Sequence, residues 1–272
     1  MRSRDRRFGK HLVEKVFDLV VCEKIAHGKI SLAVHLGHAN EKRDFTVTSH
    51  EHASARVVAR FHPRWLRIYV SQKLHGDPVY PAAFALLRKS NEPILDVGCG
   101  LGLLAFYLRE RGFHPQVTGL DCDVRKIRRA THVAAFNYNS VEFCYRDVRD
   151  DFSFTGNILL FDVLHYLPPA DQRTLLKRLA DYVAPGGFLV IRDCPADRTT
   201  RFWLTYIAEI FAQSISWNLT APLHFPSRET ICNAFEHERF LQRSGPLWGR
   251  TPFNNHLFIF QRHAGAIAPA QG

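Results

Sequence analysis

The amino-acid sequence predicts an α/β fold in which a mostly parallel sheet is covered by helices. From Glu92 onward, short apolar runs alternate with segments of helical periodicity, which is typical of parallel strands joined by helices. The first apolar run, Ile94–Val97, leads directly into Gly98, Gly100 and Gly102. A strand followed by a glycine-rich loop and a helix is where open α/β sheets bind nucleotide-like ligands. Both the fold and a ligand edge are therefore expected.

The apolar runs and the glycine and proline breaks between them define the expected elements in order. Strands are predicted at 94–97, 116–120, 141–145, 158–161, 188–191, 240–244 and 257–261. Helices are predicted at 64–74, 81–88, 101–112, 124–136, 170–183, 198–214 and 227–237. The long link between the two closing strands disfavours a tight hairpin.

The chain is predicted to have three parts. Residues 1–63 form a basic N-terminal extension of α+β character, with an amphipathic helix at 9–26 and short strands at 30–35 and 44–48. Residues 64–263 form the main domain, and the Ala/Gly/Pro-rich tail 264–272 is expected to be disordered. Residues 1–80 carry 15 Lys and Arg against 8 Asp and Glu, so much of the net charge of +10 lies in the N-terminal part. A nucleic acid or an anionic membrane surface could bind there, although a solvated charged face is the simpler interpretation.

Composition limits the class of protein. No apolar run approaches the roughly 18 residues of a membrane span, and no signal-peptide pattern follows the Arg-rich start, so a cytoplasmic location is expected. The six cysteines are scattered without a C-x-x-C pair, which indicates reduced thiols and predicts no metal site.

The glycine spacing indicates the kind of ligand. A dinucleotide fingerprint reads G-x-G-x-x-G, whereas here the third glycine comes one position early and Leu103 occupies its place, which disfavours an NAD-dependent oxidoreductase. Asp96 lies inside the strand end, where a carboxylate suits a ligand with an ammonium group. The run Asp96-Val97-Gly98-Cys99-Gly100-Leu101-Gly102 resembles the first motif of the class I S-adenosylmethionine (SAM) dependent methyltransferases.

Three later segments extend this resemblance in the right order. Asp121, followed by Cys122, stands where the family's second strand ends on an acid that binds the SAM ribose, and a carboxylate suits a vicinal diol. Asp147 and Val148 occupy the positions that the family uses for adenine. The fourth segment, Leu160–Leu167, resembles the strand that ends beside the transferable methyl group, and Pro185-Gly186-Gly187 matches the turn before the fifth strand.

The resemblance implies a fold and a set of site residues. The fold is a Rossmann-like, seven-stranded, mostly parallel sheet whose last strand inserts antiparallel between its neighbours, with helices on both faces. The cofactor is SAM, and the residues expected to bind it are Asp96, Gly98, Cys99, Gly100, Gly102, Asp121, Cys122, Asp147, Val148 and Phe161.

Candidate catalytic residues lie where the fourth strand opens into its loop: Asp162, His165 and Tyr166. His165 is the best candidate for a general base because an unperturbed imidazole titrates near neutrality, although it could instead pack at the strand end. Aromatic residues after the fifth strand favour a small aromatic or lipid-like acceptor, methylated at oxygen or carbon. Two alternatives remain open: an RNA or tRNA methyltransferase that uses the basic N-terminal segment, and a non-catalytic SAM-binding regulatory subunit. Peripheral membrane contact also remains open, and the oligomeric state is not predicted.

Overall fold

The computed structural model describes residues 48–264 except 216, 219 and 220. The chain divides into two compact units, 1–44 and 45–272, and all of the described residues belong to the second. The predicted helix at 9–26, the strands at 30–35 and 44–48, and almost all of the predicted tail lie outside the described residues.

The second unit begins before a helix that the sequence did not predict. Helix α2 (His50–Ala59) starts at Ser49, whose side chain accepts a hydrogen bond from the His52 N–H. Its buried residues Ala53 and Val57 belong to the same hydrophobic core as the sheet. The boundary of this unit therefore lies near residue 45 rather than at 63, because α2 buries its apolar side against the domain.

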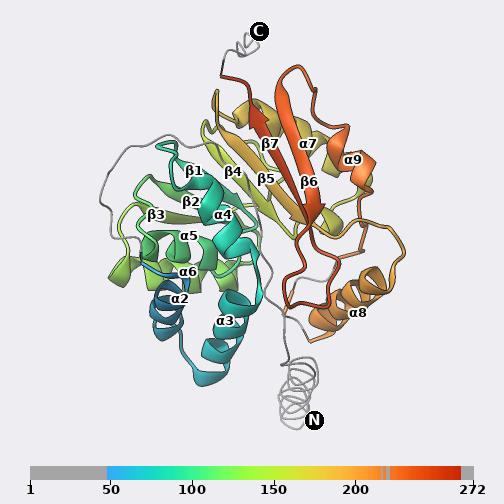
Figure 1. Ribbon diagram of the computed structural model, residues 1–272. Helices are drawn as coiled ribbons and strands as arrows, with labels where there is room; N and C mark the ends of the chain where they lie inside the picture. Colours follow the sequence, from blue (N-terminus) through green and yellow to red (C-terminus); the bar gives the residue numbers. More distant parts are fainter. Residues whose placement is uncertain (1–47, 216, 219–220, 265–272) are drawn as a thin grey trace. The chain divides into compact units, whose positions relative to one another are not determined.

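A seven-stranded sheet forms the centre of the unit, in the order β3-β2-β1-β4-β5-β7-β6 (Figure 1). Strand β7 lies between β5 and β6 and is antiparallel to both, which confirms the predicted insertion of the last strand. The strands are β1 (Ile94–Val97), β2 (Val117–Asp121), β3 (Val141–Tyr145), β4 (Asn157–Phe161), β5 (Phe188–Asp193), β6 (Phe240–Pro246) and β7 (His256–Arg262).

Helices cover both faces of this sheet. One face shares a core with α2, α3 (Arg64–Gly76), α4 (Val79–Leu87), α5 (Leu103–Glu110) and α6 (Val124–Asn137). The other shares a core with α7 (Pro169–Tyr182) and α9 (Arg228–Cys232). Alternate strand residues serve the two cores: Leu159 packs in the first, and Ile158 and Leu160 pack in the second. The sequence predicts a helix over 227–237, but the observed helix α9 ends at Cys232.

Helix α8 (Thr200–Ser214) follows β5 and lies apart from these two layers, beyond the end toward which β5 runs (Figure 1). Phe202 and Thr205 face inward and are buried, whereas Trp203, Leu204, Ile207 and Ile210 are exposed. Among the residues described, no helix is long and apolar enough to cross a membrane.

Candidate active site

The glycine loop after β1 lies at the carboxyl edge of the sheet. Gly98, Gly100 and Gly102 all have positive φ, at 78°, 55° and 71°. A Cβ atom on Gly98 would lie 2.2 Å from Val163 Cγ2, and one on Gly102 would lie 2.3 Å from Phe143 Cζ. A Cβ atom on Gly100 would meet no atom within 4 Å. Two of the glycines therefore let the loop pack on its neighbours, while Gly100 leaves open space above the loop.

Asp96 and Asp121 stand on either side of this loop. Asp96 is buried, and burial followed by the charge of Asp121 raises the pKa of its carboxyl to about 7. Within the described part of the chain, no cationic side chain forms an ion pair with Asp96. The Asp121 carboxylate accepts hydrogen bonds from the backbone N–H of Gly100 at 2.8 Å and of Asp123 at 2.7 Å. A buried carboxyl without a cation and a carboxylate turned toward the glycine loop both suit a polar, ammonium-bearing ligand.

The remaining residues predicted to bind the cofactor surround this pair. Cys99 lies in the loop, where burial raises the pKa of its thiol, and Cys122 is exposed directly after Asp121. The loop after β3 reaches the end of β2, since the Arg146 N–H donates to the Asp121 carbonyl at 3.1 Å. The Asp147 carboxylate forms an ion pair with Arg149 at 2.6 Å.

Val148, which follows Asp147, differs from the rest of this set because it is buried in the core shared with α7. The structure therefore brings the predicted residues to one edge, but it directs the Val148 side chain away from that edge into the protein interior.

A buried ionic network that sequence reasoning missed holds the end of β4. Asp162 has a left-handed backbone, at φ 58°, and its carboxylate accepts two hydrogen bonds from Arg192 of β5. Arg192 also donates to Asp77, which follows α3, and Lys73 lies 3.9 Å from Asp77. Burial lowers the pKa of Arg192, but the charges of Asp162 and then Asp77 raise it above its usual value. The one signal in the sequence is an arginine that directly follows the apolar run 188–191 of β5.

His165 is buried rather than open to a ligand. Its Nδ1 atom lies 2.8 Å from the Asp193 carboxylate, which also accepts from the Leu164 N–H at 3.0 Å. The imidazole stacks on Phe225, with ring centroids 5.0 Å apart and an interplanar angle of 11°. Burial lowers the pKa of His165, but the charge of Asp193 and its hydrogen bond raise it to about 9. Its Nε2 atom, by contrast, is buried and has no hydrogen-bond partner among the described residues.

Tyr166 belongs to a second polar cluster, which reaches across the carboxyl edge. Its hydroxyl donates to Glu209 of α8, and Asn218 Nδ2 donates to the same hydroxyl at 2.8 Å. Asn218 Oδ1 accepts from Lys126 Nζ at 3.0 Å. This chain of contacts links the end of β4 to α8 and to the start of α6. Glu209, Asn218 and Lys126 carry no sequence motif that would have identified them.

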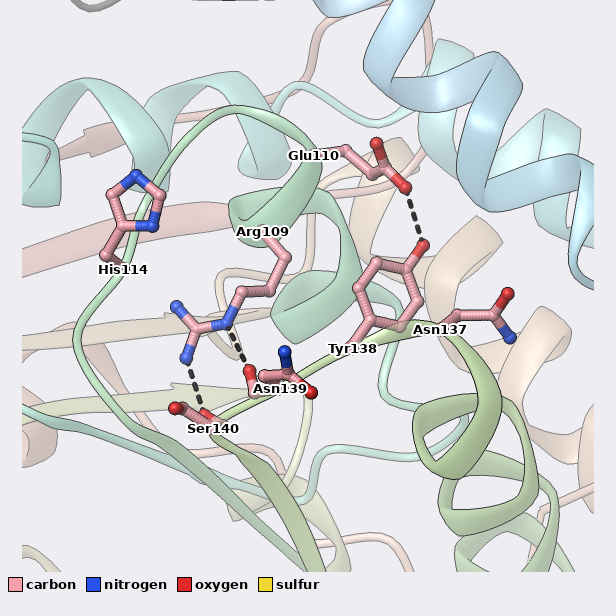
Figure 2. Close-up of a pocket in the computed structure, with 7 residues that line it drawn as sticks. All are labelled: Arg109, Glu110, His114, Asn137, Tyr138, Asn139 and Ser140. Atoms are coloured by element: carbon pink, nitrogen blue, oxygen red, sulfur yellow. Dashed lines mark hydrogen bonds between the residues drawn. The ribbon is translucent and has the colours of Figure 1, made fainter.

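A cavity of about 320 Å³ lies away from this edge (Figure 2). It lies between the end of α5 and the segment that precedes β3, at the amino end of the strand. Arg109 donates there to the carbonyls of Asn139 at 3.1 Å and Ser140 at 2.5 Å, and the Tyr138 hydroxyl donates to Glu110 at 3.0 Å. These hydrogen bonds hold the segment before β3 against the end of α5. The polar residues that line the cavity therefore have a structural role.

Comparison with known proteins identifies the family. Residues 77–263 match a family model described as a methyltransferase domain. The chain belongs to this methyltransferase family. An uncharacterized methyltransferase of Mycobacterium tuberculosis is 31% identical over 177 residues, covering 62% of this chain and 85% of the relative. A tRNA N(3)-methylcytidine methyltransferase of Schizosaccharomyces pombe is 26% identical, covering 60% of this chain and 68% of that protein.

Solved structures show the same fold. The magnesium protoporphyrin IX methyltransferase of Synechocystis, with bound S-adenosylhomocysteine, has a TM-score of 0.55 at 18% identity, covering 77% of this chain and 93% of that one. The pyocyanin biosynthetic protein PhzM has a TM-score of 0.55 at 16% identity, covering 77% and 61%. The predicted Rossmann-like methyltransferase fold is confirmed, and the protein is a SAM-dependent methyltransferase. Among the described residues, no three His, Cys, Asp or Glu side chains gather as metal ligands.

Proposed function

We propose that this protein transfers a methyl group from SAM to a small acceptor with an aromatic or lipid-like body. The observation that supports this acceptor is an aromatic cluster at the carboxyl end of β4. Phe225, stacked on His165, also contacts Phe202 and Tyr206 of α8, with ring centroids 5.3 and 6.0 Å apart. Aromatic walls beside a few fixed polar groups are typical of small-molecule sites.

The residues of the carboxyl edge fit the donor. We assign the SAM ammonium to Asp96 and the ribose hydroxyls to Asp121, with Gly98, Gly100 and Gly102 allowing close approach of the backbone. The open space above Gly100 and the raised pKa of Asp96 without an ion-pair partner both support this assignment. We place the adenine beside Asp147 and the backbone of Val148, and the methyl end beside Phe161 and Asp162.

Bound SAM supplies an electrophilic methyl group, so the protein must align the acceptor and exclude water. Such positioning can contribute about 7–11 kcal/mol. Arg192 fixes Asp162 and the backbone at the end of β4, while Tyr166 and Asn218 lie over the same edge. Their contribution is therefore to hold the acceptor in line.

A proton must leave an acceptor that is an alcohol or a phenol. His165 is buried, and we assign this residue, through Asp193, to positioning the turn after β4. Glu209 is the better candidate, because Tyr166 and Asn218 orient its carboxylate at the edge. A general base contributes about 10²–10⁴-fold to the rate.

One labelling experiment tests the acceptor class. The full-length protein is incubated with methyl-labelled SAM and a fractionated cell extract, and we expect the label in the small-molecule or lipid fraction. Label in RNA would replace our proposal with the tRNA or RNA alternative. SAM binding without label in any fraction would support a non-catalytic SAM-binding subunit.

A further inference from the structure

A smaller cavity, of about 170 Å³, lies between α3 and α6 beside the glycine loop. Leu101 of that loop, Trp65 of α3 and Trp217 line it. An engineered cavity of about 150 Å³ in another protein is large enough for benzene. The space therefore suits one aromatic ring or a group of similar size.

The charge of this cavity is positive. Arg125, Lys126 and Arg129 line it from little more than one turn of α6, against a single acid, Asp123. Asp123 caps α6 and is already paired with Arg125 at 2.8 Å. Among the residues that the structure describes, no carboxylate lies within ion-pair distance of Lys126 or Arg129. These two cations remain available to an anion.

Aromatic rings hold both cations in place. The Arg129 guanidinium lies 5.7 Å from the centroid of the Trp65 ring, and Lys126 Nζ lies 5.9 Å from that of Trp217. The two indoles meet edge-on with centroids 5.8 Å apart, and Tyr69 contacts Trp217 at 4.6 Å. Flat apolar walls and two positioned cations together form a site for a planar anion.

Two contacts connect the residues of the cavity to the edge where methyl transfer is proposed. Leu101 belongs to the glycine loop, and Lys126 reaches Asn218, which in turn contacts the Tyr166 hydroxyl. A molecule bound against the two indoles would therefore lie beside the glycine loop.

We infer that this cavity binds the anionic group, a carboxylate or a phosphate, of an aromatic acceptor. The inference rests on the proposed function, because it specifies the acceptor of that same site. Lys126 and Arg129 neutralise the anion, and Trp65 and Trp217 contact the adjoining ring. The size of the cavity favours a small molecule over a nucleic-acid strand.

Calorimetric titration of the full-length protein, saturated with S-adenosylhomocysteine, tests the inference. The probes are 2-naphthoate and 2-naphthyl phosphate, with the neutral 2-naphthamide as their matched control. We expect both anions to bind about three- to tenfold more tightly than the amide, with the difference shrinking as salt is added. Equal binding of the anions and the amide would overturn the inference.

Substitutions in α6 show which of its cationic side chains bind the anions. Lys126→Met and Arg129→Met keep the stem of the side chain and remove its charge, and each should weaken the anions about three- to tenfold. Arg128→Met is the matched control, because Arg128 lies on the same helix and does not line the cavity. It should leave binding unchanged. An equal loss in all three variants would show only a general surface charge and would overturn the inference.

Two further outcomes also contradict the inference. If Lys126→Met and Arg129→Met weaken S-adenosylhomocysteine instead of the naphthalene anions, the cavity belongs to the donor. If a short uridylate oligonucleotide binds more tightly than 2-naphthoate and depends on the same two residues, the cavity is part of a nucleic-acid surface. Failure of the labelling experiment leaves this titration interpretable, since it requires no methyl transfer.

Discussion

The two sides of the carboxyl edge are built in different ways. On the side that we assign to the donor, neighbouring strand ends and one glycine loop bring Asp96, Gly100 and Asp121 together, and the Gly100 N–H donates to the Asp121 carboxylate. On the side that we assign to the acceptor, the contacts join residues far apart in the chain, such as Trp65 with Trp217 and Tyr166 with Glu209. The donor site therefore depends on local backbone geometry, whereas the acceptor site depends on which distant segments the fold brings together.

The largest expected effect falls on the ionic network around Arg192, at the end of β4. Arg192→Met should lower the free energy of unfolding by about 3–5 kcal/mol, because it leaves Asp77 and Asp162 without their buried cation. Denaturant unfolding measures the change. Arg239→Met is the control, since its pair with Asp181 is solvent-accessible and should contribute about 0–1 kcal/mol. Similar losses in the two variants would show that the Arg192 network stabilises the fold no more than a solvent-accessible ion pair does.

On the donor side, Asp121→Ala should weaken SAM binding about 100-fold. It removes an acceptor that we assign to the ribose hydroxyls, and a buried polar partner without its acceptor costs roughly 1–3 kcal/mol or more. Calorimetric titration with SAM provides the measurement, and Asp171→Ala, in the first turn of α7, is the control. Unchanged affinity in Asp121→Ala would remove this residue from the donor site.

The pH dependence of SAM binding reports on Asp96. Its pKa of about 7 in the free protein lies above the usual value, so the carboxyl is largely protonated below pH 7, and its contribution to the free energy of unfolding is lost as pH rises toward 7. Binding an ammonium group must then release a proton, and SAM affinity should rise roughly tenfold per pH unit from pH 5.5 toward 7 before levelling off. Asp96→Asn should bind weakly and without this slope. A wild-type profile that is flat over this interval would contradict the assignment.

The smallest effect on SAM binding is expected on the acceptor side. Tyr166→Phe removes the hydroxyl that contacts Glu209 and Asn218, and it should lower kcat/KM about tenfold, since an orienting hydrogen bond contributes roughly 0.5–1.5 kcal/mol. SAM affinity should stay within about twofold of the wild type. Steady-state kinetics with the acceptor found by labelling, together with SAM titration, separate the two quantities. A loss of SAM affinity equal to the loss in kcat/KM would place Tyr166 with the donor.

The same contrast explains what the sequence could predict. The strands from β1 to β5 and the order of acidic residues at their ends follow from apolar runs and a short motif, so the fold and the cofactor were predictable. Arg192, Glu209 and Asn218 lie in no motif, because their roles arise only when β5, α8 and the segment after it meet the sheet. His165 is the opposite case, because the sequence singles it out but does not reveal its surroundings. Its residue type suggests a base, whereas its burial and its contact with Asp193 follow only from the fold.

The assignment of the donor site depends most on the open space above Gly100. It is tested by SAM titration of Gly100→Ala beside Gly112→Ala, because both glycines have positive φ, at 55° and 87°, and neither added Cβ meets a protein atom within 4 Å. Both substitutions should cost about 1–2 kcal/mol of stability through backbone strain. We predict that SAM affinity falls at least tenfold in Gly100→Ala and stays within about twofold of the wild type in Gly112→Ala. Equal SAM affinity in the two variants would contradict the assignment of this space to the methyl donor.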